Sequence, residues 1–65
     1  MAGNAMTRTY IARRLLEHGP LTFREFVEIT GWTVRVAHRA LYRLRQFGLA
    51  RMVSLGGHRY HHELC

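Results

Sequence analysis

The segment that most constrains how this chain can fold is residues 34–47, because its apolar and polar residues separate onto two faces of a helix. At about 100° per residue, one arc holds Val34, Ala37, Ala40, Leu41, Leu44 and Phe47. The opposite arc holds Arg35, Val36, Arg39, Tyr42, Arg43 and Gln46, with His38 and Arg45 at the border. The pattern predicts an amphipathic helix that ends before Gly48 and packs one face on a core.

A first helix is predicted over about residues 8–18. Thr7 or Thr9 can cap its start, and Gly19-Pro20 stops it because proline cannot continue a helix. Residues 1–6 have neither the basic start nor the apolar run of a signal peptide, and we expect them to form a flexible leader.

A second helix is predicted over about residues 23–29. Thr22 and Glu25 have the spacing of a capping box, in which each residue bonds the other's backbone N–H. The break at residues 30–32 contains a glycine, and Thr33 can cap the next helix. Two helices joined by so short a link are typical of a helix-turn-helix.

A β-hairpin is predicted after Gly48. Residues 49–55 and 58–64 are rich in residues that suit strands, and Gly56-Gly57 can form a two-residue turn. With that turn, Val53 should face Tyr60, and Leu55 should face His58. The predicted fold class is therefore mainly α with a small β-hairpin.

A length of 65 residues is enough for one domain, which we expect to span residues 7–65. Its predicted core takes apolar side chains from every element. These are Ile11, Leu15, Phe26, Ile29, Ala37, Leu41, Leu44, Leu49 and Tyr60.

The charge of the chain points to a polyanionic partner. Ten arginines stand against four glutamates, with no lysine and no aspartate, and the net charge is +6. Residues 29–62 hold six of these arginines and no acid. Such an imbalance favours nucleic acid as the partner.

Residues 33–49 (TVRVAHRALYRLRQFGL) resemble the winged helix-turn-helix family of prokaryotic and phage transcriptional regulators. Gly19-Pro20-Leu21-Thr22 is similar to the family's break before its second helix. The resemblance implies a three-helix winged helix-turn-helix whose third helix, residues 34–47, enters the major groove. It also implies that the hairpin, residues 50–63, is a wing that touches the flanking backbone.

The candidate DNA-binding residues lie on the third helix and the hairpin. Arg35, Arg39 and Arg43 recur every four residues, a spacing at which like charges repel. Because this arrangement lowers helix stability, it suggests that these arginines contact DNA. Arg59, beside the Gly-Gly turn, is the wing candidate, and Arg51 on the partner strand is a weaker one. The remaining candidates are Thr33, Val36, His38 and Tyr42.

Neither metal binding nor catalysis is favoured by the sequence. His58, His61, His62 and Cys65 are closely spaced, but strand alternation sends His61 and His62 to opposite faces. The chain also has no pair of acids placed to work together and no phosphate-binding glycine loop. We therefore expect no enzyme activity, no metal and no cofactor.

The function that fits these features best is a small DNA-binding transcription regulator, of phage or mobile-element origin and located in the cytoplasm. Its expected partner is duplex DNA and not a membrane, since no apolar run approaches the ~20 residues of a membrane span. We expect a monomer in dilute solution that forms a homodimer on DNA. Two alternatives stay open: a protein-interaction winged helix of a larger complex, and a non-specific binder of nucleic acid, including RNA.

Overall fold

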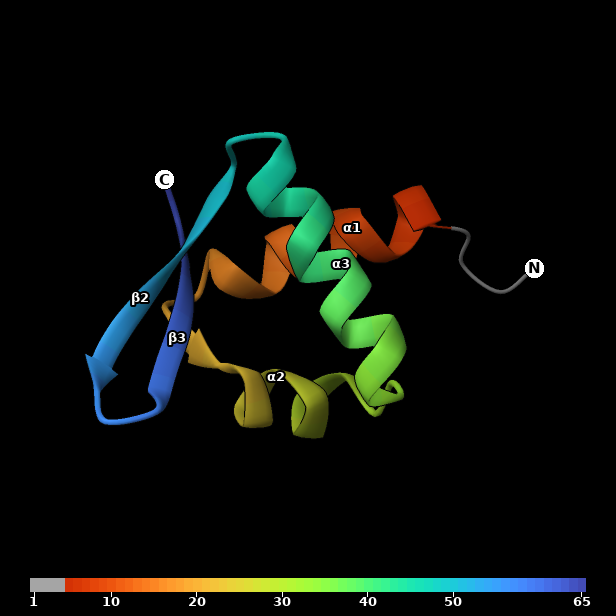
Figure 1. The fold of residues 1–65 in the computed structure, drawn as a ribbon. Helices are drawn as coiled ribbons and strands as arrows, with labels where there is room; N and C mark the ends of the chain where they lie inside the picture. Colours follow the sequence, from red (N-terminus) through yellow and green to blue (C-terminus); the bar gives the residue numbers. More distant parts are fainter. Residues whose placement is uncertain (1–4) are drawn as a thin grey trace.

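The computed structural model describes residues 5–65, which form three helices and a three-stranded antiparallel sheet (Figure 1). In chain order the elements are α1 (Ala5–Leu16), β1 (Leu21–Thr22), α2 (Phe23–Thr30), α3 (Val34–Gln46), β2 (Ala50–Gly56) and β3 (Arg59–Leu64). The predicted fold class, three helices followed by a hairpin, is confirmed and is consistent with a winged-helix-like topology. None of the described helices is both long and apolar enough to cross a membrane.

Helix α1 differs from its predicted bounds at both ends. It begins at Ala5, so Thr7 and Thr9 lie inside the helix and neither caps its start. Ala5 and Met6 belong to α1 and not to a leader, because both residue types favour helix; the rest of the predicted leader, residues 1–4, lies outside the described residues. The helix ends at Leu16, before Gly19 turns the chain with φ of 134°.

The starts of α2 and α3 follow the predicted caps. The Glu25 N–H donates to Thr22 Oγ1 at 3.1 Å, and the Thr22 N–H donates to Glu25 Oε1 at 2.8 Å. The Val36 N–H donates to Thr33 Oγ1 at 3.2 Å. Between the helices Gly31 takes a left-handed φ of 70°, which favours glycine. The link between α2 and α3 is residues 31–33, a short link with a glycine as predicted, but it begins one residue later than expected because Thr30 belongs to α2.

The sheet contains a strand that the sequence pattern did not predict. Strand β1 pairs with β3, with Leu21 opposite His62 and Thr22 opposite His61, and the strand order is β1-β3-β2. A strand of two residues is too short to show an alternating pattern, so periodicity could not reveal it.

The predicted hairpin register was wrong by one residue. Val53 pairs with His61 and not with Tyr60, and an irregularity between Ser54 and Gly56 leaves Leu55 unpaired. The turn consists of Gly57 and His58 instead of two glycines. A one-residue slip changes which face each side chain occupies, and Tyr60 consequently stays 44% exposed.

Most of the predicted core is confirmed. Phe26, Ala37, Leu41 and Leu44 are buried, and Leu15 and Leu49 pack against them while partly buried. The other apolar residues that are buried are Ala12, Leu16, Ala40 and Ala50.

Two further core predictions were wrong: Ile11 is 40% exposed and Ile29 is 56% exposed. Helix α2 packs inward through Phe23, Phe26 and Val27, and Ile29 lies about 110° around the helix from their side. Val34, the first residue of α3, and Phe47, its C-cap, belong to the predicted apolar arc but are also exposed.

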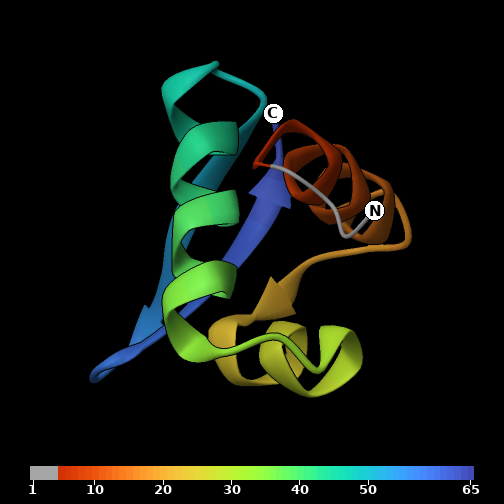
Figure 2. The same cartoon turned by 90° about the vertical axis from the view of Figure 1, so that its right-hand side faces the viewer.

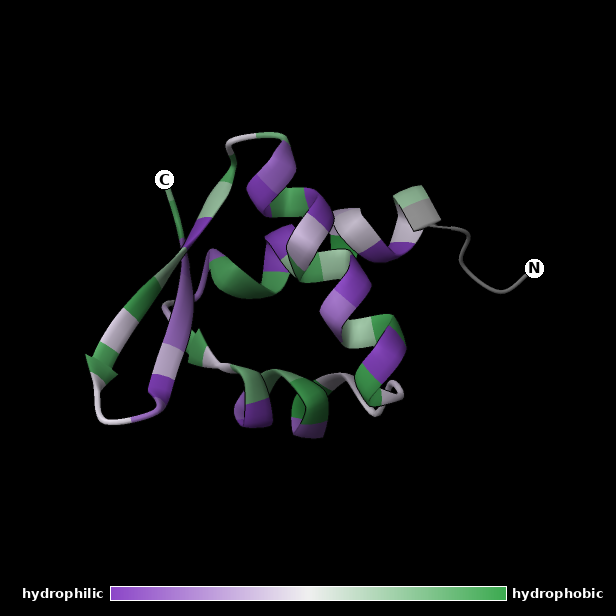
Figure 3. Cartoon of the chain, viewed as in Figure 1, coloured by the Kyte–Doolittle hydropathy of each residue, from purple (hydrophilic) through white to green (hydrophobic). Residues whose placement is uncertain are grey.

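In Figure 1 helix α3 crosses in front of α1, and the hairpin lies to the left of α3. In Figure 2 α1 lies to the right of α3, and the hairpin runs behind α3. Along α3, hydrophilic and hydrophobic residues alternate in short stretches (Figure 3). Ala37, Ala40, Leu41 and Leu44 of α3 are buried, whereas Arg35 and Arg39 are exposed.

Candidate nucleic-acid interface

The outward face of α3 consists of Arg35, Arg39, Tyr42 and Gln46, all exposed. They lie opposite the buried stripe of the helix, which ends in Leu44. The predicted candidates Arg35, Arg39 and Tyr42 are thus brought together on one open surface. Arginine side chains on an open helix face can reach phosphates or the edges of bases.

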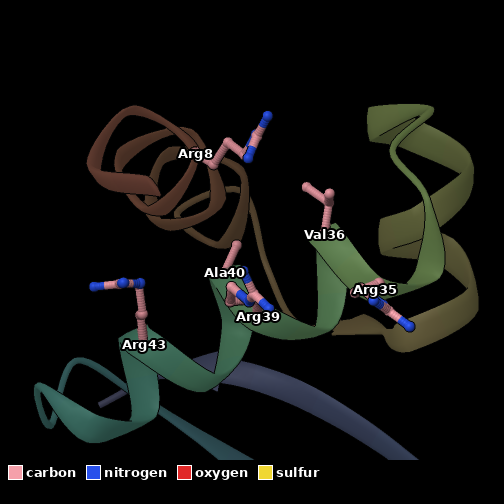
Figure 4. Close-up of a pocket in the computed structure, with 6 residues that line it drawn as sticks. All are labelled: Arg8, Arg35, Val36, Arg39, Ala40 and Arg43. Carbon is pink, nitrogen blue, oxygen red and sulfur yellow. The ribbon is translucent and has the colours of Figure 1, made fainter. Parts of the chain in front are cut away.

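One flank of this face turns toward α1. Val36 and Arg43 are half-buried there, and with Arg8 of α1 they border a hollow of about 120 Å³. In Figure 4, Arg8 stands on α1, whereas Arg35, Val36, Arg39, Ala40 and Arg43 stand on α3. The predicted candidates Val36 and Arg43 therefore lie at the edge of the outward face of α3 and not at its centre.

The other flank of α3 packs on α2 and the sheet. The His38 ring meets the Phe23 ring edge to face, with centroids 6.0 Å apart. Arg45 places its guanidinium 5.6 Å from the centre of the Tyr42 ring and its Nη1 2.6 Å from His62 Nε2. His38 and Arg45 thus have partners within the protein, whereas Arg35 and Arg39 form no ion pair with any residue from 5 to 65.

The contact between Arg45 and His62 fixes the state of the buried imidazole. A guanidinium can only donate, so His62 Nε2 must accept and the neutral ring carries its proton on Nδ1. His62 Nδ1 is buried and has no hydrogen-bond partner within residues 5–65. Burial, followed by the charge of Arg45, lowers the pKa of His62 from 6.5 to about 4.

This lowered pKa predicts a loss of stability in mild acid. Above pH 6.5 the ring is neutral in both folded and unfolded chains; below it the unfolded chain binds the extra proton. The free energy of unfolding should therefore fall with decreasing pH down to about 4, by at most about 1.4 kcal/mol per pH unit. Urea denaturation at pH 5.0 to 7.5 measures this slope.

His58→Gln is the matched control for that measurement, since His58 is exposed in the turn of the same hairpin. It should keep the slope of the wild type, whereas His62→Leu should flatten it. Glu63 contributes little between pH 7.5 and 5.0. Its hydrogen bonds from His61 and Arg51 lower the pKa of its carboxyl from 4.5, so the stability that it adds is lost mainly below pH 4.5. A wild-type stability that is level from pH 7.5 to 5.0 would contradict the assignment.

The two arginines of the hairpin have different surroundings. Arg51 donates from Nε to Glu63 Oε2 at 2.7 Å and is held in an ion pair with it. Arg59 is exposed beside the turn and forms no ion pair with any described residue. Arg59 is therefore the hairpin arginine that is open to a ligand.

Each of the four glutamate side chains forms an ion pair or a hydrogen bond with a residue of its own or the adjoining helix, its helix cap or the neighbouring strand. Glu17 pairs with Arg14, Glu28 with Arg24, and Glu63 with Arg51, while Glu25 accepts from the Thr22 backbone. Across residues 5–65, no ion pair involves the arginines at the α1–α3 side, on the outward face of α3 or at the wing tip. These are Arg8, Arg35, Arg39, Arg43 and Arg59.

His61 and His62, near the end of the chain, contact protein side chains on opposite sides of β3. His61 Nε2 lies 2.9 Å from Glu63 Oε1, whereas His62 faces Arg45 on the other side of the strand. Cys65 is exposed. Within the part of the chain that the structure describes, no three side chains of the types that bind metals come together.

Arg8 is the site residue that sequence reasoning missed. It lies one helical turn before Ala12, which is completely buried, so the spacing along α1 could have placed it beside the contact with α3.

The chain was compared with protein-family models, curated proteins and solved structures, and none of them matched.

Proposed function

We propose that this protein is a duplex-DNA-binding transcription regulator of the winged helix-turn-helix type. Helix α3 would enter the major groove, and the hairpin of β2 and β3 would act as the wing against the backbone. The observation that carries the proposal is the exposed face with Arg35 and Arg39, on a helix that follows a short capped turn and has no carboxylate beside it.

The two ends of the surface would have different roles. Arg35 and Arg39 lie in the first half of α3, the end that reaches base edges in helix-turn-helix docking. Arginine can bond guanine O6 and N7 together. Arg43 and Arg59 lie further along, where phosphates are the neighbours expected. Thr33 would add a phosphate contact at the helix N-terminus.

The proposal extends to the setting in which the protein acts. A domain of 65 residues covers few base pairs, and two-fold operators are bound by paired domains. We therefore propose a homodimer on DNA, formed by chains that are monomeric in dilute solution. The reducing cytoplasm is the proposed location, since the chain has a single cysteine and hence no internal disulfide.

A second candidate function is docking on another protein. Met52, Leu55 and Tyr60 of the hairpin are 42–50% exposed, and exposed apolar side chains are the anchors that protein interfaces use. These residues lie on the wing and not on the arginine-bearing face of α3, so DNA remains the partner that explains the charge.

The test of the proposed function is the salt dependence of binding to short duplexes. If arginines neutralise phosphates, log K should fall with log salt by about 0.9 per phosphate, for a slope of roughly −3 to −6. Fluorescence anisotropy with duplex, single-stranded and RNA oligomers measures it. A flat response with duplex would remove DNA as the main partner, and stronger binding to RNA or single strands would favour the non-specific alternative.

A further inference from the structure

The hollow between α1 and α3 gathers positive charge from two helices. Arg8 of α1 and Arg43 of α3 border it, together with Arg35 and Arg39. Its remaining lining residues are Val36 and Ala40, whose small side chains leave room for a group of atoms to approach. In Figure 4 the side chain of Ala40 points toward α1, whereas Arg35 points away from it.

No carboxylate in the described chain balances these charges. The four ion pairs within residues 5–65 involve Glu17, Glu28 and Glu63, and none includes an arginine of the hollow. Arg8 and Arg43 are each half-buried. A cluster of this kind attracts an anion with several acceptor oxygens, and phosphate fits the fork of arginine.

The position of the hollow relates it to the outward face of α3. It lies beside that face, on the side toward α1. The hairpin packs on α3 through β2 and on α1 through β3. A helix in the major groove has one phosphate backbone on either side of it. The strand on the hairpin side would meet Arg59, and the strand on the α1 side would meet the hollow.

We infer that the hollow is a phosphate site that holds the DNA backbone on the α1 side of α3, with Arg8 as a contact from outside the helix-turn-helix. This inference rests on the proposed function and adds a residue and a strand contact to it. Val36 and Ala40 would face the sugar, and Arg8 and Arg43 would bond phosphate oxygens.

The test compares Arg8→Ala with Arg13→Ala in duplex binding. Both variants remove one positive charge from α1, but Arg13 is exposed and does not border the hollow. Arg8→Ala should weaken binding to any duplex sequence about tenfold, which is the loss expected for one charge-assisted contact. It should also reduce the salt slope by about one. Arg13→Ala should stay within about twofold, and Arg8→Lys should fall between Arg8→Ala and the wild type.

The outcomes separate this inference from the proposed function. If the wild type binds duplex but Arg8→Ala behaves like Arg13→Ala, the phosphate site is overturned and the DNA-binding proposal stands. If the wild type binds no duplex, both fall. Inorganic phosphate, titrated at constant ionic strength and followed by NMR, tests the other source of this ligand. Millimolar binding that depends on Arg8, without duplex binding, would assign the hollow to free phosphate and overturn the DNA contact. Equal thermal melting of the variants verifies that each is folded.

Discussion

Replacing Leu41 with alanine is expected to lower the free energy of unfolding by about 2–5 kcal/mol. Leu41 is 1% exposed and belongs to the cluster with Phe26 and Leu44 that joins α2 to α3. A domain of 65 residues has a total stability of only ~3–10 kcal/mol, so this loss should remove much of it. Thermal and urea denaturation followed by circular dichroism measure the change.

Val34→Ala is the matched control for Leu41→Ala. Val34 lies on the same helix and is 61% exposed, so its truncation should change stability by no more than about 0.5 kcal/mol. Comparison of the two variants separates the loss of core packing from any general effect on α3. A Leu41→Ala protein that melts at the wild-type temperature would contradict the central position of this side chain.

Elements with strong local signals could be predicted from the sequence. Helix α3 has three full turns of separated faces and a threonine cap, and its observed span, Val34–Gln46, is one residue shorter than predicted. Thr22 and Glu25 marked the start of α2 because a capping box depends on residues three apart and on nothing distant.

Features that depend on distant contacts could not be predicted in this way. Strand β1 exists because Leu21 and Thr22 meet β3, about forty residues later. The hairpin register depends on the irregularity at Leu55. The glycine pair that marks the predicted turn does not reveal this irregularity. The error in the predicted register placed Tyr60 in the predicted core. In the structure Tyr60 is exposed, and the buried residue of β3 is His62.

The candidate interface divides in the same manner. Arg35 and Arg39 are exposed together because they share a helix, and helical spacing alone predicts that arrangement. Arg8 comes from another helix, and its place at the hollow that Arg43 also borders depends on how α1 packs on α3. The engagement of Arg51 by Glu63 likewise depends on the register of the two strands.

Arg39→Ala, and in the same way Arg35→Ala, is expected to weaken binding to the preferred DNA site more than binding to random duplex. Arginine that bonds two acceptors of guanine discriminates against other bases by about 1–3 kcal/mol, so the preference should fall roughly five- to 150-fold. Both side chains are exposed and free of ion pairs with the described residues, and alanine keeps the helix intact. The preferred site is obtained by selection from random oligonucleotides, and each variant is titrated against that site and a scrambled duplex at fixed salt.

Two comparisons show whether the loss comes from base contacts or from charge. Arg43→Ala and Arg59→Ala should weaken binding to both duplexes about equally and flatten the salt slope by about one, because phosphate contacts carry no sequence information. Arg24→Ala removes the same charge from α2, where Arg24 is exposed and pairs with Glu28, and it should change neither affinity appreciably. If Arg35→Ala and Arg39→Ala bind the selected site like the wild type, α3 does not recognise sequence. The arginine face would then serve charge alone, and docking on a protein through the hairpin would become the better account of this domain.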